Sequence, residues 1–181
     1  RLANEICPLI KRSRVTLDLH STHCPGDVPF AFCDYPDKYN QTLINALDVE
    51  YVLEGWPEIY GRQQQITDYS TEHCAHAYGK TATTLECGYH KAPEAAELAY
   101  RAIVGTLAAF GMTDGELPFS CRKQRIRMDS FVIKEREGKL CRAYKHLDKI
   151  SKGERLAVYD DGRFCMHLMT DISFCLIWKP I

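Results

Sequence analysis

Two short runs in this sequence place reactive side chains at the ends of apolar strands. In the first, Asp-Leu-His-Ser (18–21), His20 follows the β-branched run 15–19 and begins a loop. Ligands of open α/β sheets bind beyond the carboxyl ends of the strands, so an imidazole there is well placed to ligate a metal, with Asp18 as its hydrogen-bond partner. The alternative is a histidine whose ring hydrogen-bonds a backbone carbonyl, which is the commoner case for an isolated histidine.

The second run is Thr-Leu-Glu-Cys-Gly (84–88), in which Glu86 closes a buried strand and Gly88 leaves room for a close backbone approach. A half-buried carboxylate beside a metal can act as the general base for water. The alternative is a glutamate that caps or pairs at the end of the strand. Neither run decides the function by itself.

The elements that must position these residues alternate between strands and helices. The sequence predicts helices over 2–12, 39–48, 71–78 and 93–110. The signals are hydrophobic periodicity, Ser70 as an N-cap, Pro93 as a first helical residue, and glycines where helices end. Apolar β-branched runs predict strands over 15–19, 49–53, 63–69 and 81–86, with a loop over 21–40. This alternation is typical of an α/β layer with a largely parallel sheet.

The chain changes character after residue 115. Short β-rich runs separated by turn residues follow, at 126–135, 140–146, 155–159, 163–169 and 172–178. Asp-Asp-Gly (160–162) between two of these runs predicts a hairpin. Residues 1–115 carry 9 Lys and Arg against 15 Asp and Glu, a net charge of −6, whereas residues 116–181 carry 14 against 9, a net charge of +5. We therefore expect two domains, an α/β domain over 1–115 and a small all-β domain over 116–181.

Composition excludes several classes of protein. The 181 residues are 45% hydrophobic and 26% charged, which is ordinary for a globular protein. No apolar run approaches the roughly 20 residues that span a bilayer, so we expect no membrane-spanning segment. The basic charges of the second half alternate with apolar residues as on solvated strands, without an aromatic-basic motif, so we expect no nucleic-acid partner.

The nine cysteines favour a reducing compartment. They are widely scattered, odd in number and contain no Cys-x-x-Cys pair, which fits neither a disulfide framework nor a tetrathiolate zinc site. Most have apolar neighbours, where a reduced cysteine acts as a small hydrophobic residue. We therefore expect a cytoplasmic protein.

Taken together and in order, the two motifs resemble those of the succinylglutamate desuccinylase/aspartoacylase family. The matching residues are Asp-Leu-His-Ser (18–21), Pro-Phe-Ala-Phe (29–32) and Leu-Glu-Cys-Gly-Tyr-His (85–90), followed by the helix 93–110. Members are zinc-dependent amidohydrolases related to zinc carboxypeptidases. The resemblance implies a partial zinc-peptidase-like mixed sheet with flanking helices, followed by a small all-β domain.

The resemblance also implies roles for two residues. His20 would be the third zinc ligand, and Glu86 would be the carboxylate that activates the zinc-bound water and passes its proton to the leaving amine. The family supplies its other two zinc ligands from an upstream His-x-x-Glu motif, and this sequence contains none. We therefore expect the chain to be the C-terminal portion of a longer enzyme, inactive by itself.

Other histidines are weaker candidates. His23 could substitute as a ligand, although a loop histidine near a site more often hydrogen-bonds substrate or water. His73 and His76 share one side of a helix and could form a second metal site, but no further ligand has a suitable spacing. His90 could line the pocket, and the histidines of the second half are expected to be surface or core residues.

The leading prediction is zinc-dependent hydrolysis of an amide bond in an N-acyl amino acid or a similar small acylated amine. Two alternatives stay open: a non-catalytic fragment or pseudoenzyme module without metal, and a carboxypeptidase-like peptidase. Substrate-binding residues cannot be assigned from the sequence. Strand edges left open would favour association, so a homo-oligomer is a further possibility.

Overall fold

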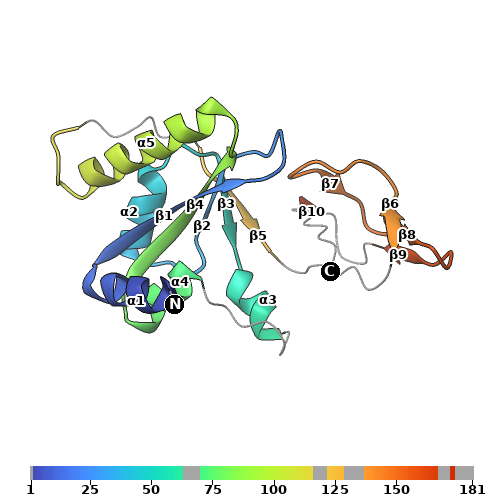
Figure 1. The fold of residues 1–181 in the computed structure, drawn as a ribbon, viewed down its shortest axis with the longest axis horizontal. Coiled ribbons are helices and arrows are strands. Elements are labelled where there is room, and N and C mark those ends of the chain that lie inside the picture. Colours follow the sequence, from blue (N-terminus) through green and yellow to red (C-terminus); the bar gives the residue numbers. More distant parts are fainter. Residues whose placement is uncertain (1, 63–69, 116–121, 129–136, 167–171, 174–181) are drawn as a thin grey trace. The chain divides into compact units, whose positions relative to one another are not determined.

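The computed structural model describes residues 2–62, 70–115, 122–128, 137–166 and 172–173 (Figure 1). They belong to two compact units, one of residues 1–25 and 29–129 and the other of residues 26–28 and 130–181. The change from the first unit to the second therefore lies further along the chain than residue 116. The reason is that strand β5 (Gln124–Arg127) pairs with strand β3 (Tyr51–Glu54) of the first unit.

The first unit contains a five-stranded mixed sheet in the order β1-β4-β2-β3-β5. The remaining strands are β1 (Val15–Thr22), β2 (Phe30–Phe32) and β4 (Thr81–Tyr89). Neighbouring strands are parallel except β2 and β4, which are antiparallel. The mixed α/β fold class predicted from the sequence is confirmed.

In the described part of this unit, five helices accompany the sheet: α1 (Leu2–Arg12), α2 (Lys38–Ala46), α3 (Trp56–Arg62), α4 (Thr71–Ala77) and α5 (Pro93–Ala109). Four of them were predicted, and α3 was not. The loop predicted over 21–40 is wrong in part, because β2 lies within it and α2 begins before its end. The strand predicted over 63–69 lies outside the described residues.

Local signals explain where three of these helices begin or end. The side chain of Asp37 accepts a hydrogen bond from Asn40 N at 2.7 Å, and that of Ser70 accepts one from His73 N at 3.0 Å, so each satisfies an amide that the helix leaves unpaired. Pro93 opens α5, where its missing amide hydrogen is not needed. Gly111 ends it with φ at 66°, a conformation that favours glycine.

Helices cover both faces of β1 and β4, with α2 and α5 on one side and α1 and α4 on the other (Figure 1). The larger core lies under α2 and α5, where Leu85 and Cys87 of β4 meet Leu98 of α5. A smaller cluster on the opposite face joins Ile10 of α1, Ala75 of α4 and Ala82 of β4. Successive strand residues alternate between faces, so even-numbered residues of β1 and β4 lie on the α4 side.

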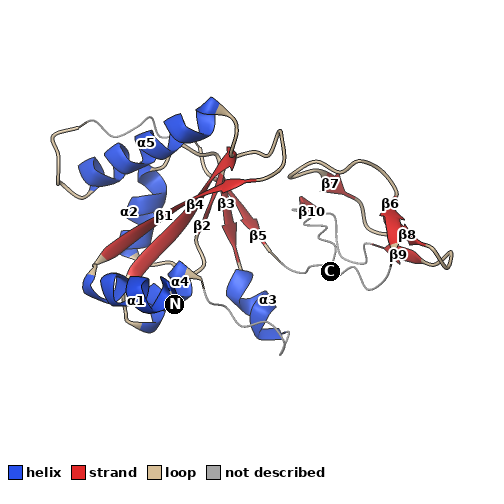
Figure 2. Cartoon of the chain, in the orientation of Figure 1, coloured by secondary structure: helices blue, strands red, loops and turns tan. Residues whose placement is uncertain are grey.

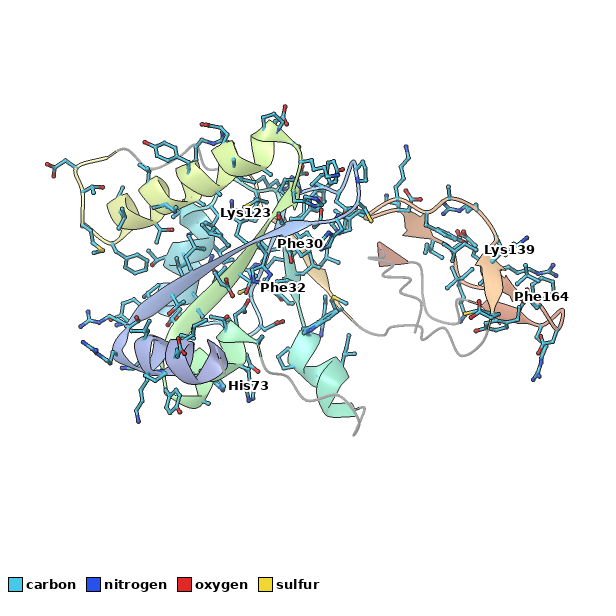
Figure 3. The ribbon with its side chains drawn as sticks, viewed as in Figure 1. Phe30, Phe32, His73, Lys123, Lys139 and Phe164 are labelled. Carbon is cyan, nitrogen blue, oxygen red and sulfur yellow. The ribbon has the colours of Figure 1, made fainter. Side chains whose placement is uncertain are left out.

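Aromatic and charged side chains make further contacts at the short strands of the same sheet. The rings of Phe30 and Phe32 on β2 meet edge to face at 5.3 Å (Figure 3). Lys123, just before β5, donates hydrogen bonds to the carbonyls of Leu47 and Val49. The two Lys123 hydrogen bonds attach the start of β5 to the segment that leads into β3.

The described residues of the second unit form strands and loops without a helix (Figure 2). An antiparallel three-stranded sheet has the order β6-β8-β9, with bounds Gly138–Leu140, Arg155–Tyr159 and Phe164–Met166. The predicted hairpin at Asp-Asp-Gly (160–162) is confirmed, and Gly162 has φ at 80°. A second pair joins β7 (Lys149–Ile150) to β10 (Ile172–Ser173). The core of this unit is built around Ile150 and Leu156.

Candidate metal and catalytic site

The two predicted site residues are direct neighbours across the pair of parallel strands. In the register of β1 and β4, His20 lies opposite Glu86 and Asp18 lies opposite Thr84. All four residues are even-numbered and therefore share the face on the α4 side. The structure thus brings His20 and Glu86 together near the carboxyl ends of two adjacent strands.

A bulge in β4 directly follows this pair. The register shifts between His20 and Thr22, so that β4 advances by three positions, from Glu86 to Tyr89, where β1 advances by two. Gly88 has φ at 88°, which lies in the left-handed region that side chains disfavour. Gly88 is therefore required for the turn of the backbone that ends the strand just beyond the candidate base.

The His20 ring lies between two carboxylates. Its Nε2 is 3.3 Å from Oδ1 of Asp18, and its Nδ1 is 3.7 Å from Oε1 of Glu86. An acceptor beside Nε2 favours the tautomer with the proton on that nitrogen, which leaves the lone pair of Nδ1 on the Glu86 side. The His20 side chain is 52% exposed and that of Glu86 only 18%, so the imidazole is open to solvent while the carboxylate is largely enclosed.

The first turn of α4 holds both strands just before this pair. The hydroxyl of Thr71 donates to Oδ2 of Asp18 at 2.6 Å, and Oε1 of Glu72 accepts from Thr84 N at 2.9 Å. Since Asp18 and Thr84 are opposite each other in the register, the first turn of α4 hydrogen-bonds β1 and β4 at the same position along the two strands. Thr71 thereby fixes the carboxylate that orients the His20 ring.

Glu72 is an unusual carboxyl because it is only 3% exposed. β2 pairs with β4 only at Leu85 and Glu86, so the amide of Thr84 needs another acceptor, and Glu72 provides it. Burial, together with the nearby charge of Asp34, raises the pKa of Glu72 to about 7. Glu72 therefore supports the strand while keeping its proton over much of the acidic range.

Two further histidines lie just beyond the ends of β1 and β4. Nδ1 of His90 is 2.8 Å from the carbonyl oxygen of Thr22, and the rings of His23 and His90 meet edge to face at 5.0 Å. Both residues are exposed. This arrangement places His90 against Thr22, two residues after His20, and His23 against His90. That His90 lines the pocket stays a prediction.

Cys87 is the sulfur closest in sequence to Glu86, but it faces the other way. Its side chain belongs to the core between β4, α2 and α5. Burial, and then the charge of Glu86, raises the pKa of Cys87 to about 11. Cys87 is therefore a packing residue that keeps its proton, since a nucleophilic cysteine needs an accessible thiolate.

The His73 and His76 pair on α4 lies next to a tyrosine. The hydroxyl of Tyr35 is 3.1 Å from Nδ1 of His73, and the Tyr35 ring stacks on His76 at 4.1 Å with the planes 13° apart. Figure 3 marks His73 on this short helix. Among the residues that the structure describes, no group of three or more His, Cys, Asp or Glu side chains could hold a metal ion.

The number of available ligands also decides whether the described residues can hold zinc at His20. The imidazole and the Glu86 carboxylate are donors that zinc accepts, and the Asp18 carboxylate lies 3.3 Å from Nε2, on the side where a ligating histidine typically has a carboxylate partner. A zinc site nevertheless uses three or four protein ligands. The described residues therefore fit part of a zinc site and do not complete one.

Thr71 and Glu72 are the residues of this site that sequence reasoning missed. Both lie in the predicted helix that follows Ser70, where only capping was expected. The hydrogen bond from Thr71 to Asp18 spans 53 residues of sequence, and no local pattern indicates it. The only available signal was a glutamate early in a short helix, which is equally typical of a surface-exposed first turn.

Comparison with solved structures defines the class of fold. The chain has the fold of succinylglutamate desuccinylase/aspartoacylase proteins, which confirms at the level of fold the resemblance noted in the sequence. It is similar to a succinylglutamate desuccinylase/aspartoacylase from Rhodobacter sphaeroides at a TM-score of 0.65 and 14% identity, covering 94% of this chain and 54% of that one. A succinylglutamate desuccinylase from Vibrio parahaemolyticus gives 0.63 and 14%, covering 94% and 53%.

A third similar structure is the ectoine utilization protein EutE from Ruegeria pomeroyi, at a TM-score of 0.63 and 18% identity, covering 94% of this chain and 57% of that one. The chain thus spans little more than half the length of the structures it matches. No protein-family model matches the sequence, and a search of curated proteins finds no significant match. No helix among the described residues is long and apolar enough to cross a membrane.

Proposed function

We propose that these residues form part of a zinc-dependent amidohydrolase that cleaves the amide bond of an N-acyl amino acid or a similar small acylated amine. The observation that carries the proposal is the pairing of His20 with Glu86 at adjacent strand ends, in a fold shared with desuccinylase and aspartoacylase proteins. Either residue alone would have an ordinary structural explanation. Their register and the carboxylate behind His20 together favour a catalytic site.

In this proposal His20 binds the metal through Nδ1. Asp18 keeps the proton on Nε2 and holds the ring in place, and Thr71 in turn holds Asp18. A bound zinc ion supplies a Lewis acid that polarises the amide carbonyl and makes water more acidic. The contribution of this chain is to present one imidazole with a fixed tautomer and orientation.

Glu86 acts as the general base and then as the general acid. Its carboxylate takes a proton from the water that attacks the amide carbon, and it returns that proton to the nitrogen when the carbon–nitrogen bond breaks. The products are a free carboxylic acid and a free amine. The low exposure of Glu86 suits this role, because few water molecules compete for its oxygens.

The remaining metal ligands must come from outside the described donors. The sequence contains no His-x-x-Glu, so we propose that such a motif lies elsewhere in the complete gene product and completes the site. The 181 residues by themselves are then expected to bind zinc weakly and to hydrolyse nothing. Tight stoichiometric zinc bound by these residues in elemental analysis would contradict this part of the proposal.

The test of function is an amine-release assay on the complete gene product. N-acetyl and N-succinyl amino acids are incubated with the zinc-loaded and the chelated protein, and the free amine is measured with an amine-reactive dye. We expect release that depends on zinc and is lost in His20→Ala but kept in the matched control His76→Ala. Release that survives both chelation and His20→Ala would exclude the proposed site, and the absence of release from every acylated amine would favour a non-catalytic module.

A further inference from the structure

Two cysteines on different helices lie close together on the α4 side of the sheet. The Sγ atom of Cys74 on α4 is 3.0 Å from the Sγ atom of Cys7 on α1, although 67 residues separate them in sequence. Both are free thiols of intermediate exposure. Cys74 also packs against the small buried cluster of Ile10, Ala75 and Ala82, so its position is fixed by its neighbours.

A second contact joins α1 to the residue that ends α4. Nζ of Lys11 lies 5.0 Å from the centre of the Tyr78 ring. Lys11 is four residues after Cys7, and Tyr78 is four residues after Cys74, so this contact lies about one helical turn beyond the thiol pair on both segments. A disulfide requires its sulfurs to be about 2 Å apart, so closing the bond needs a movement of only about 1 Å.

The hydrogen bond between the thiols gives them unequal roles. Cys74 donates its proton to Cys7, and this bond is the main reason that the pKa of Cys74 rises to about 11. Cys74 therefore holds its proton, and we assign the first reaction with an oxidant to Cys7, the sulfur that accepts this hydrogen bond. By contrast, burial raises the pKa of both Cys33 and Cys87, and these two lie in the main core.

We propose that Cys7 and Cys74 are an oxidative modification site that forms a reversible disulfide between α1 and α4, with a peroxide as oxidant. The Cys7 thiolate attacks hydrogen peroxide, which breaks the oxygen–oxygen bond, forms a sulfenic acid and releases hydroxide. The Cys74 sulfur then attacks the Cys7 sulfur, its proton leaves with the hydroxyl as water, and the sulfur–sulfur bond forms. The proton that Cys7 gave up to form its thiolate neutralises the hydroxide, so in total two thiols are oxidised, one peroxide is reduced and two water molecules are produced. A dithiol such as dithiothreitol reverses the bond by exchange.

The position of this bond connects it to the candidate site. Cys74 is one turn after Thr71 on the same helix, and Thr71 holds Asp18 behind His20. A disulfide would link α4 to α1 covalently. It would restrict movement of the first turn of α4 away from β1 and β4, the strands to which this turn is hydrogen-bonded. The inference rests on the geometry of the thiols and does not depend on the proposed hydrolase activity.

Peptide mapping tests the proposal because trypsin separates the two cysteines cleanly. Cleavage after Arg1, Lys11, Arg62 and Lys80 gives peptides 2–11 and 63–80, each with a single cysteine. After treatment of the protein with hydrogen peroxide, alkylation and digestion, we expect these two peptides joined, with a mass about 2 Da below their sum, and separated again by dithiothreitol. The link should disappear in Cys7→Ser and in Cys74→Ser but remain in the control Cys24→Ser.

Hydrogen exchange provides an independent measurement on the folded protein. The amides of residues 71–77 should exchange more slowly in the oxidised protein than in the reduced protein, and peroxide should not change them in Cys7→Ser. A map in which Cys7 is linked to another cysteine would overturn the proposal. So would accumulation of Cys7 sulfinic acid with Cys74 still reduced, because it would show that the two sulfurs do not meet.

Discussion

The histidines of β1 and of α4 lie on the same side of the first unit in very different surroundings. His20 has a carboxylate near each ring nitrogen, with Asp18 at 3.3 Å and Glu86 at 3.7 Å. His73 and His76 instead meet the hydroxyl and the ring face of Tyr35. The first arrangement offers an oriented lone pair beside a candidate base, whereas the second offers stacking and a hydrogen bond.

The difference teaches that strand register, more than sequence spacing, brings a ligand and a base together. His-x-x-His on a helix is the more visible motif, yet the structure gives it no third donor among the described residues. His20 and Glu86 are 66 positions apart, yet they are opposite neighbours in the ladder. Three changes test whether the strand-end pair, rather than the helix pair, carries the chemistry, and a fourth, at Glu72, tests the support of the strand beneath it.

The largest effect is expected for Glu86→Gln. Glutamine has nearly the same shape but cannot accept a proton, so turnover of an acylated amine by the complete gene product should fall by roughly 10²–10⁴-fold. The melting temperature should stay close to that of the unmodified protein. The matched control is the exposed Glu94→Gln on α5, which should keep full activity. Retained turnover in Glu86→Gln would place the base elsewhere.

The next effect is on stability, at Glu72. Below pH 4.5 the Glu72 carboxyl is protonated in the folded and the unfolded chain alike, and between pH 4.5 and about 7 only the unfolded chain gives up the proton. The Glu72 contribution to the free energy of unfolding is thus fully present below pH 4.5 and declines as the pH rises to about 7, by about 3 kcal/mol in all.

Glu72→Gln removes this titration and should flatten the pH dependence over the same range. Urea unfolding of both proteins at pH 4.5, 6 and 7.5 measures it. The unmodified protein should lose stability relative to Glu72→Gln as the pH rises, because the glutamine stays neutral at every pH. A constant difference between the two proteins would show that Glu72 does not titrate in this range.

A smaller effect is expected for Thr71→Val, which keeps the shape of the side chain and removes the hydroxyl that binds Asp18. We expect a loss of about 1 kcal/mol in unfolding free energy, and a loss of roughly 10–100-fold in zinc affinity or turnover as the His20 ring loses its support. The control is Thr42→Val on α2, whose hydroxyl bonds the carbonyl of Lys38 far from this site. If Thr71→Val and Thr42→Val lose turnover equally, Thr71 has no specific role in positioning His20.

The smallest effect is expected for His73→Ala. The helix keeps its start, because Ser70 caps the backbone amide of residue 73 and not its ring. Stability should change by no more than about 0.5 kcal/mol, and turnover should not change. A loss of activity comparable to that of His20→Ala would reverse the comparison and assign the metal to α4.

Much of the framework could be predicted from sequence because the signals are local. The apolar β-branched runs at 15–19 and 81–86 indicated β1 and β4, and Pro93 with Gly111 marked the ends of α5. Asp-Asp-Gly (160–162) correctly indicated a hairpin. These elements depend on turn chemistry and on short-range periodicity, which a single sequence shows directly.

The rest depends on contacts that are distant in sequence. β2 has three residues in a loop rich in proline, and it becomes a strand only because β3 and β4 lie on either side of it. The start of the second unit was placed too early because β5 belongs to the sheet of the first unit. The pairing of His20 with Glu86 followed from the family resemblance, while the support from Thr71 and Glu72 had no signal beyond a glutamate early in a short helix.

The most direct test of the account is anomalous diffraction at the zinc absorption edge, on crystals of the complete gene product grown with zinc. The account predicts a peak beside Nδ1 of His20, close to the carboxylate of Glu86, that is absent in crystals of His20→Ala. A peak only at His73 and His76, or no peak near His20 in a protein that hydrolyses its substrate, would contradict it.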